Sequence, residues 1–470
     1  MVTIMKKAII FILVFLVALC PMYILPSVSA SDFIVENGVL LSYTGSKTSV
    51  TIPDSVYYIA DGAFKDNTKI SKVNLTANVQ IIGNEAFYGC TSLKEVSGGK
   101  NVGYVGAYAF YNTPYFYSNT DKLLILGSVL LGGIVEGKLE IDSDIRMIAP
   151  YAFADNGSIT SVTAHDSLST IGEGAFYRCS ALKYVDVSDN LSSVEPLAFF
   201  DTAFVNEYDG DFVTIGNGAL IQYKGNSSTV NIPDNVRHIA GGAFYSNSDI
   251  KKVIIPEGVS AIGKRAFANC SKLAYVSMPA SLVMIDTEAF ARCKALDNIT
   301  VPENVGLMGE SIFYSCNSLE TAVFLNSADI GVGTFVNCSN LSFVKLSGSI
   351  TSIGNSAFLN CSSLTDLSVS DKVKSIGEDA FKGCDTLTIS CNKSSYANEY
   401  AFENDINVLQ CGDANLDGKV NIRDATYIQK YVAALVEFSD LELLRAEVNF
   451  DDKINVRDAT YIQKLLAGMV

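Results

Sequence analysis

The sequence predicts a solenoid of stacked short repeats followed by a small helical module, and three observations support this fold class. An aromatic marker recurs across most of the chain, mostly at intervals of 23 residues. Each repeat carries one alternating apolar segment and one turn signal, so it needs neighbours to bury its apolar face. Two nearly identical acidic segments, whose matching residues lie 34 positions apart (Asn421 and Asn455), occupy the C-terminus.

The marker is the phenylalanine of the stretch KKVIIPEGVSAIGKRAFANCSKL, residues 251–273. Two intervals are long, 43 residues before Phe153 and 45 before Phe244. Stacked rings are expected to form a ladder in which each buried ring contributes roughly 1.5–3 kcal/mol. The marker phenylalanines of the successive repeats are Phe64, Phe87, Phe110, Phe153, Phe176, Phe199, Phe244, Phe267, Phe290, Phe313, Phe335, Phe358, Phe381 and Phe402.

One repeat divides into four pieces. Apolar residues alternate over 253–255, which predicts a short strand. Pro256 and Gly258 end that strand, because proline cannot donate to a sheet and glycine permits a turn. Residues 262–263 begin a second extended piece, and residues 266–268 predict a single helical or 3₁₀ turn.

Two predicted hairpin inserts, near residues 111–147 and 200–238, interrupt the period. A new series of repeats begins after each hairpin, at Ile59, Ile148 and Ile239. These starting points are 89 and 91 residues apart, which suggests a duplicated three-repeat block. Uninterrupted repeats are expected from Phe244 to Phe381. The strand–glycine turn–strand pattern occupies residues 33–45, 121–132 and 211–225.

Residues 385–411 depart from the repeat and predict a cap with one strand and one amphipathic helix over 395–404. Terminal repeats of solenoids are atypical because they shield the last open core. No linker follows, and the helical module is expected to start at residue 412. The array is therefore assigned to residues 31–411.

The first 30 residues are typical of a secretory signal. Lys6 and Lys7 precede an apolar run over 8–19, and a small-residue site ends at Ala30. A retained membrane anchor and lipidation at Cys20 are alternatives, although Leu19 is larger than a lipoprotein box prefers. A secreted, extracellular protein that leaves the membrane after cleavage is expected, since no other segment approaches the roughly 20 apolar residues of a span.

Composition narrows the classes of partner. The formal net charge of −16 argues against nucleic acid and against anionic membrane surfaces. The chain has no tryptophan and two histidines, and this composition favours a binding protein over an enzyme.

The repeat reads strand-Ile-Pro-x-x-Val-x-x-Ile-Gly-x-x-Ala-Phe-x-x-Cys-x-x-Leu, which resembles the BspA-like bacterial leucine-rich repeat over residues 33–410. The resemblance implies a right-handed solenoid that binds or adheres and shares no catalytic residues. Its unknown protein or polysaccharide ligand would meet the outward strand positions, unless these form a merely solvated face. By register these are Lys72, Asn74, Tyr184, Asp186, Lys252, Tyr275, Ser277, Asn298, Thr300, Phe343, Lys345, Asp366 and Ser368.

Two twelve-residue segments have the spacing of calcium loops, with oxygen donors at alternating places. Gly418 fills the sixth place of the first, where the loop must turn sharply. The first loop offers Asp413, Asn415, Asp417, the carbonyl of Lys419, Asn421 and Asp424. The second offers Glu447, Asn449, Asp451, the carbonyl of Lys453, Asn455 and Asp458.

A helix is predicted after the first loop, over 425–435, with Ile428, Val432 and Leu435 on one face. Two tandem loop–helix units with aspartate at place twelve resemble a type I dockerin over residues 412–470. The resemblance implies one Ca²⁺ ion in each loop and a cohesin domain of a scaffold protein as partner. Glu447 and Asp452 depart from the family's aspartate and glycine, so the second site is expected to be weaker.

In that family, cohesin contact centres on loop places ten and eleven and on the exposed helix face. The apolar–arginine pairs found here leave the cohesin class open, and these residues are solvated helix positions on the alternative interpretation. The near-identical halves would permit two binding orientations. The residues concerned are Ile422, Arg423 and Lys430, mirrored by Val456, Arg457 and Lys464.

Cysteines three places after the marker are expected to be free, buried thiols, because their spacing is that of the repeat. The pair Cys391 and Cys411, outside that series, is the one disulfide worth testing. The series comprises Cys90, Cys179, Cys270, Cys293, Cys316, Cys338, Cys361 and Cys384.

The leading hypothesis is a secreted, non-catalytic solenoid that a dockerin attaches to a cellulosome-like complex, a setting of polysaccharide breakdown. An adhesin for host or neighbouring cells is the first alternative. A carbohydrate hydrolase hidden in the inserts is the second, although no paired carboxylates stand out there.

Overall fold

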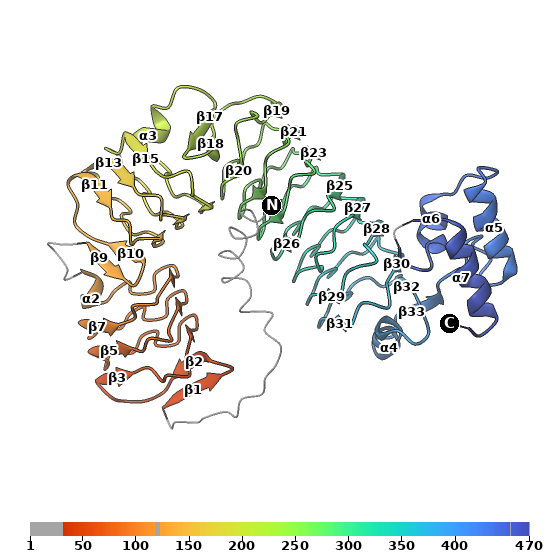
Figure 1. Cartoon of the computed structure of the whole chain (residues 1–470), viewed down its shortest axis with the longest axis horizontal. Helices are drawn as coiled ribbons and strands as arrows, with labels where there is room; N and C mark the ends of the chain where they lie inside the picture. The colour runs from red at the N-terminus through yellow and green to blue at the C-terminus, as the bar shows by residue number, and fades with distance from the viewer. Residues whose placement is uncertain (1–31, 118–122, 452, 470) are drawn as a thin grey trace. The chain divides into compact units, whose positions relative to one another are not determined.

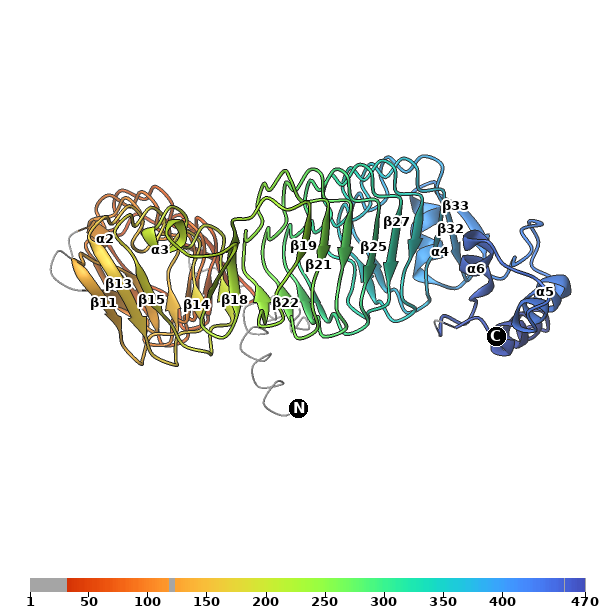
Figure 2. The ribbon, with the colours of Figure 1, turned by 90° about the horizontal axis from the view of Figure 1, so that it is seen from above.

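Short parallel strands, stacked turn upon turn, build most of the molecule (Figures 1 and 2). The computed structural model describes residues 32–117, 123–451 and 453–469, so the predicted signal over 1–30 lies outside the described residues. The chain divides into two units, Met1–Val135 with Asp144–Phe153, and Glu136–Ser143 with Ala154–Val470. Each unit is described by itself below.

The first unit contains two sheets built from successive repeats and a hairpin at each end of the run. Strand order is β1-β2-β4-β6-β8 in one sheet and β3-β5-β7 in the other, and β9-β10-β12 follow after helix α2. The elements are β1 (Phe33–Glu36), β2 (Val39–Tyr43), β3 (Ser49–Thr51), β4 (Tyr58–Ile59), β5 (Lys72–Leu75), β6 (Ile81–Ile82), β7 (Glu95–Gly98), β8 (Tyr104–Val105), α2 (Pro114–Tyr117), β9 (Leu124–Leu126), β10 (Val129–Gly132) and β12 (Met147–Ile148).

The second unit continues the same plan and adds the cap and the helical module. In the array its elements are β11 (Gly137–Ile141), β13 (Ile159–Ala164), β14 (Thr170–Ile171), β15 (Tyr184–Asp186), β16 (Ser193–Val194), α3 (Ala203–Asn206), β17 (Phe212–Ile215), β18 (Ala219–Tyr223), β19 (Thr229–Asn231), β20 (His238–Ile239), β21 (Lys252–Ile254), β22 (Ala261–Ile262), β23 (Tyr275–Ser277) and β24 (Met284–Ile285). They continue with β25 (Asn298–Val301), β26 (Leu307–Met308), β27 (Thr321–Phe324), β28 (Phe343–Lys345), β29 (Ser352–Ile353), β30 (Asp366–Ser368), β31 (Ser375–Ile376), β32 (Thr388–Cys391), α4 (Tyr396–Glu403) and β33 (Asn407–Gln410). The module contains α5 (Ile422–Val432), α6 (Asp440–Ala446) and α7 (Val456–Leu466).

Register between turns follows the 23-residue period. Lys252 of β21 lies opposite Tyr275 of β23, and Val253 lies opposite Val276. Because side chains alternate across a strand, the valines face the core and their neighbours face outward. The predicted outward positions all lie on that outer face, and none of them is buried.

The segment around each marker phenylalanine is a tight turn that the next repeat holds in place. Ala268 N donates to Arg265 O and Cys270 N to Phe267 O, at 3.1 Å each, which is the three-residue step of a 3₁₀ turn. Arg265 has a φ of +56°, so the turn cannot extend into an α-helix. Phe267 N donates to Ala289 O of the next turn at 2.8 Å. Each tight turn therefore depends on its neighbour.

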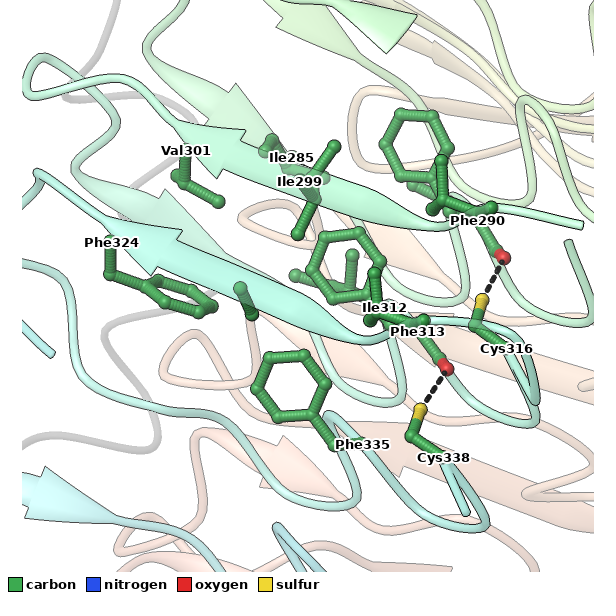
Figure 3. Close-up of a cluster of buried hydrophobic side chains, with 14 of the residues drawn as sticks. Ile285, Phe290, Ile299, Val301, Ile312, Phe313, Cys316, Phe324, Phe335 and Cys338 are labelled. Carbon is green, nitrogen blue, oxygen red and sulfur yellow. Dashed lines mark hydrogen bonds between the residues drawn. The ribbon is translucent and has the colours of Figure 1, made fainter. Parts of the chain in front are cut away.

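The marker rings form the predicted ladder (Figure 3). Phe267 and Phe290 stack with centroids 5.2 Å apart and planes 2° apart, and Phe290 continues to Phe313 at 5.7 Å. All three rings are fully buried. Parallel stacked rings at this spacing contribute packing energy beyond their burial.

The β1–β2 and β17–β18 hairpins each supply a tyrosine that starts a ladder, which the sequence analysis did not predict. Tyr43 of β2 stacks on Phe64 at 5.2 Å, and Tyr223 of β18 packs on Phe244 at 5.2 Å. The hairpins themselves are antiparallel pairs, as predicted. In these two blocks an aromatic ring from the hairpin therefore covers the first phenylalanine.

Short helices end the ladders before both inserts. Thr113 and Thr202 are buried and donate from Oγ1 to the carbonyls of Phe110 and Phe199, at 2.7 and 2.9 Å. In the helices that follow, Tyr115 meets Phe110 edge-on at 5.2 Å. Phe204 does the same to Phe199 at 6.2 Å. These edge-on rings cover the last phenylalanine of each run.

The cap corrects one prediction. Helix α4 begins after Ser395, whose side chain accepts from Asn398 N, so the predicted helix over 395–404 is confirmed. Phe402, however, is 83% exposed and does not belong to the ladder. Tyr400 takes that place and contacts Phe381 edge-on at 6.1 Å. The final interval falls on a helix, where positions two apart face different sides.

The eight repeat cysteines are free and buried, as predicted. The thiol of Cys316 donates to Phe290 O of the preceding turn at 3.2 Å, and Cys338 does the same to Phe313 O at 3.1 Å (Figure 3). Burial raises the pKa of the Cys316 thiol well above its ordinary range, so it stays protonated and able to donate. Cys391 and Cys411 are free thiols as well, so no disulfide joins the pair.

Candidate metal centre

The C-terminal module has its own small core, separate from that of the array. Helices α5 and α7 pack against each other, and α6 lies between them in the sequence. Small side chains allow this close packing. The core residues are Cys411, Ala414, Ala425, Ile428, Ala446, Val448, Ala459 and Ile462.

Two aspartates organise the first loop by accepting backbone N–H groups. Asp413 accepts from Asp417 N at 3.0 Å through Oδ1 and from Gly418 N at 2.9 Å through Oδ2. Asp424 accepts from Asn415 N at 3.1 Å and from Asn421 N at 2.8 Å. The first and twelfth places of the loop are thereby tied to its interior.

The first loop leads directly into helix α5 through a capping box. The side chain of Asn421 accepts from Arg423 N at 3.0 Å, while the carboxylate of Asp424 accepts from Asn421 N. The helix consequently starts at Ile422, three residues before the predicted start. It ends at Val432, so Leu435 lies beyond it and is 73% exposed, and Val432 is 41% exposed. The predicted apolar face of three residues is therefore wrong except for Ile428.

The second loop repeats this bonding with one change. Asp458 accepts from Val448 N at 3.1 Å and from Asn455 N at 2.9 Å. Asn455 caps helix α7 as Asn421 caps α5. Glu447, at the first place, accepts from Asp451 N at 2.8 Å. Asp452, at the place of Gly418, lies outside the described residues.

The charges in the first loop favour a bound cation. Asp413 and Asp424 are 1% and 0% exposed. Burial raises the pKa of the Asp424 carboxyl, and the charges of Asp413 and Asp417 raise it further, although backbone N–H bonds oppose them. Burial likewise raises the pKa of Asp458. Buried anions that repel one another are stabilised by a cation among them.

The donors of both loops are carboxylate, amide and carbonyl oxygens, the set that a hard cation such as Ca²⁺ prefers. Asn415 and Asn449 each accept from a loop amide at 2.9 Å, from Asp417 N and Asp451 N. Among the described residues, no three His, Cys, Asp or Glu side chains are gathered as a metal-holding cluster. The fit to calcium thus comes from the donor types and the repelling buried carboxylates.

The two predicted partner-binding pairs are exposed in matching positions. Ile422 is 56% exposed and Val456 57% exposed, each at the start of its helix. The arginines and lysines that accompany them, Arg423, Lys430, Arg457 and Lys464, are exposed too. Arg457 forms a loose ion pair with Asp451 at 3.7 Å. Each loop–helix unit therefore exposes one apolar side chain at the start of its helix.

A contact between this module and the array was not anticipated from the sequence. Arg445 of α6 forms ion pairs with Asp366 of β30 at 2.6 Å and with Asp413 of the first loop at 3.4 Å. Asn392, beside the cap, donates to Tyr461 Oη at 3.1 Å. No sequence period links these residues, so pattern analysis has no signal for them.

Comparison with known proteins agrees with this division. The stacked repeats define a leucine-rich-repeat solenoid, and the two loop–helix units define a calcium-loop module. A family profile described as "BspA type Leucine rich repeat region (6 copies)" matches residues 40–120, 137–220, 213–341 and 328–412, which is more than half of the chain. The chain belongs to this family. A second profile, "Dockerin type I domain", matches residues 411–467.

Solved structures with detectable similarity include bacterial leucine-rich repeat proteins. A leucine rich cell surface protein from Faecalibacterium prausnitzii is 23% identical, covering 69% of this chain and 95% of that one, with a TM-score of 0.29. A protein from Bacteroides ovatus is 19% identical, with 79% and 94% covered and a TM-score of 0.28. The pneumococcal vaccine antigen PcpA is 19% identical, with 80% and 95% covered and a TM-score of 0.32. No curated protein matched.

Membership of these two families implies general properties of the chain. Leucine-rich repeats and dockerins are non-catalytic binding modules, type I dockerins bind calcium, and a dockerin implies a cohesin partner. Both kinds of module are typical of extracellular proteins. Among the described residues, no helix has the length and apolar character that a membrane crossing requires.

Proposed function

We propose that the chain is a secreted, non-catalytic binding protein that a calcium-dependent dockerin attaches to a cohesin-bearing scaffold, in a cellulosome-like complex that breaks down polysaccharides. In this proposal residues 1–30 are a cleaved signal, residues 31–411 form the recognition array and residues 412–470 form the dockerin. The observation that carries it is the twofold repetition of loop bonding, helix cap and exposed apolar–arginine pair in the C-terminal module.

Each loop would hold one Ca²⁺ ion. In the first loop the ion would supply positive charge beyond that of the Arg445 guanidinium, and in both loops it would fix the loop against its helix. The first set is Asp413, Asn415, Asp417, the Lys419 carbonyl, Asn421 and Asp424. The second set is Glu447, Asn449, Asp451, the Lys453 carbonyl, Asn455 and Asp458.

The second loop would be the weaker site. Glu447 adds a methylene to the first ligand, which increases the rotamer freedom that binding must restrict. Asp452 stands where glycine turns the first loop, and Gly418 has a φ of +81° there. A non-glycine residue in that region costs roughly 1–2 kcal/mol, less for aspartate. Calorimetric titration should show two unequal steps, and two equal tight steps would contradict this assignment.

The cohesin would meet the exposed starts of α5 and α7. Apolar Ile422 and Val456 provide buried area, while arginine and lysine side chains set charge preference at the rim. The near-identical halves support binding in either of two orientations. The proposed contact residues are Ile422, Arg423, Lys430, Val456, Arg457 and Lys464.

A panel of purified cohesins, probed with the full chain with and without a chelator, tests the attachment. Binding of at least one cohesin is expected with calcium and should be lost with chelator. The quadruple variant I422A/R423A/V456A/R457A should lose binding while keeping both calcium steps. Binding that survives chelation, or survives the quadruple variant, would refute the proposal.

The outer strand face of the array would bind an extended protein or polysaccharide. Tyr184 and Tyr275 are 72% and 41% exposed there, and Lys252 Nζ lies 4.9 Å above the Tyr275 ring. Exposed aromatic and charged groups at regular spacing suit a repeating ligand. A polysaccharide panel with wild type and Y184A/Y275A separates ligand binding from a merely solvated face. Activity on the same panel would instead reveal an enzyme.

A further inference from the structure

One arginine joins the first loop of the module to the array. Arg445 is 13% exposed, and its two carboxylate partners, Asp366 and Asp413, are 18% and 1% exposed. Exposed ion pairs are weak because solvent screens them, but this group is largely shielded. The array and the loop therefore share one largely shielded cation.

Several contacts hold Arg445 in this place. Helix α6 begins with a complete capping box between Ser439 and Glu442, which fixes its direction. Gly348 of the array lies so close to Phe450 that a Cβ at this position would overlap its carbonyl oxygen. With the Asn392–Tyr461 bond, the array touches α6, α7 and the second loop.

Asp413 is the residue on which the loop and the arginine converge. Its Oδ2 accepts from Gly418 N at 2.9 Å and from Arg445 Nη1 at 3.4 Å, whereas Oδ1 accepts from Asp417 N. Groups that hydrogen-bond a metal ligand orient it, and their loss typically lowers metal affinity 10–100-fold. Arg445 occupies that position relative to the first proposed ligand.

We infer that the first calcium site extends through Arg445 into the array, so that Asp366 is a positioning residue for calcium binding at Asp413. This inference depends on the proposed calcium function of the loop. It predicts that a residue on an array strand, 47 positions before Asp413, sets the affinity of the dockerin's first loop.

The charges around Arg445 determine whether loss of the Asp366 carboxylate raises or lowers calcium affinity. Asp366 lies nearer to Arg445 than Asp413 does, 2.6 against 3.4 Å, so it balances most of the arginine's charge. Removing the Asp366 charge both frees the side chain of Arg445 and leaves a cation beside the calcium ligand. Both effects lower affinity, so Asp366→Asn is the variant with the clearest expectation.

Calorimetric calcium titration of the full chain provides the test. D366N should weaken the first-loop step about 10-fold or more and leave the second-loop step unchanged. D366E, which keeps the carboxylate, should restore most of the affinity. D186N removes an exposed carboxylate at a different outer strand position, far from Arg445 in the sequence, and should change neither step. D424N, which silences the first loop, assigns the two steps.

A double-mutant cycle shows whether Asp366 acts through Arg445. R445M should weaken the first step less than D366N does, because it removes the orienting bond together with the repelling charge, and adding D366N to R445M should have little further effect. Absence of any calcium binding by wild type would refute the proposed function itself. Calcium binding with an unchanged first step in D366N, a drop in both steps, or additive effects in the cycle would each overturn this inference.

Discussion

The array and the dockerin both consist largely of tight loops, but they close those loops with different partners. In the array, the amide of Phe267 donates to a carbonyl of the next turn, and the pattern repeats at Phe290. In the dockerin, loop amides donate to the carboxylates of Asp413 and Asp424. Array loops therefore depend on neighbouring turns and little on charge, whereas dockerin loops depend on ionised groups and on what neutralises them.

Calcium removal should destabilise the dockerin and leave the array unchanged, and this is the largest difference that we expect between the two regions. A ligand at a thousandfold excess over its Kd stabilises its site by about 4 kcal/mol, and chelation removes that contribution. Hydrogen exchange of the full chain should show loss of protection in α5 and α7 on chelation. Strands β21 to β28 should keep their protection. Equal loss in both regions, or none in the dockerin, would contradict the comparison.

Truncating one ring of the phenylalanine ladder should destabilise the array and leave the dockerin unchanged. Phe290 is fully buried and stacked on both sides, so Phe290→Ala is expected to cost about 3–5 kcal/mol in the array. Denaturation followed by hydrogen exchange should show the loss around β24 and β26. The calcium titration should stay unchanged.

Phe402→Ala is the matched control, because this ring is 83% exposed. Surface changes of this kind usually shift stability by less than about 0.5 kcal/mol. A comparable loss from both variants would show that burial in the ladder is not what stabilises the array.

The half-buried carboxyl group of Glu195 tests how far the stability of the array depends on charge. Burial and, secondly, the charge of Asp286 raise the pKa of Glu195 from 4.5 to about 6, while Ser193 Oγ donates to the carboxylate at 2.7 Å. A raised pKa means that the folded state binds the proton more tightly. The contribution of Glu195 to stability is therefore most favourable below pH 4.5 and falls through pH 6, by about 2 kcal/mol in total.

Glu195→Gln should accordingly stabilise the array above pH 6 and make no difference below pH 4.5. Thermal unfolding of wild type and variant across this pH range measures the effect. Glu378→Gln removes an exposed carboxylate beside a repeat glycine and serves as control. A pH-independent gain in E195Q would assign the effect to packing, against this account.

The smallest expected effect concerns the thiol ladder. Cys316→Ala removes a buried donor to Phe290 O, but that carbonyl keeps its bond from Cys293 N at 3.2 Å. The cost should be about 1 kcal/mol, because the acceptor stays satisfied. Chemical denaturation would detect it. A loss as large as that of F290A would indicate that the thiol, not the ring, holds adjacent turns together.

Periodic features were predictable from the sequence because the same physical demand recurs in every turn. The ladder from Phe244 to Phe381, the outward strand positions and the buried cysteines all follow from one period. The spacing of the oxygen donors in the two loops could also be read from the sequence, since alternate residues on a short loop point inward. Phe402 was mispredicted because a helix replaces the repeat there and changes the period.

Contacts without a period were not predictable. Asp366 and Arg445 are 79 residues apart, and each is an ordinary surface residue by sequence. The edge-on rings of Tyr115 and Phe204 were also missed, because each belongs to a single turn of helix too short to show periodicity. The helix after the first loop starts early because Asn421 caps it, a local bond that outweighs the apolar pattern.

The buried cysteine ladder has a practical consequence for labelling. All ten cysteines of the described residues are buried, and those of the ladder donate inward to carbonyls. A thiol-directed dye added to the folded chain would find none of these sulfurs accessible. A cysteine introduced at Phe402, on the exposed side of α4, would thus be the one accessible thiol among the described residues and would place a fluorophore at a single position on the cap.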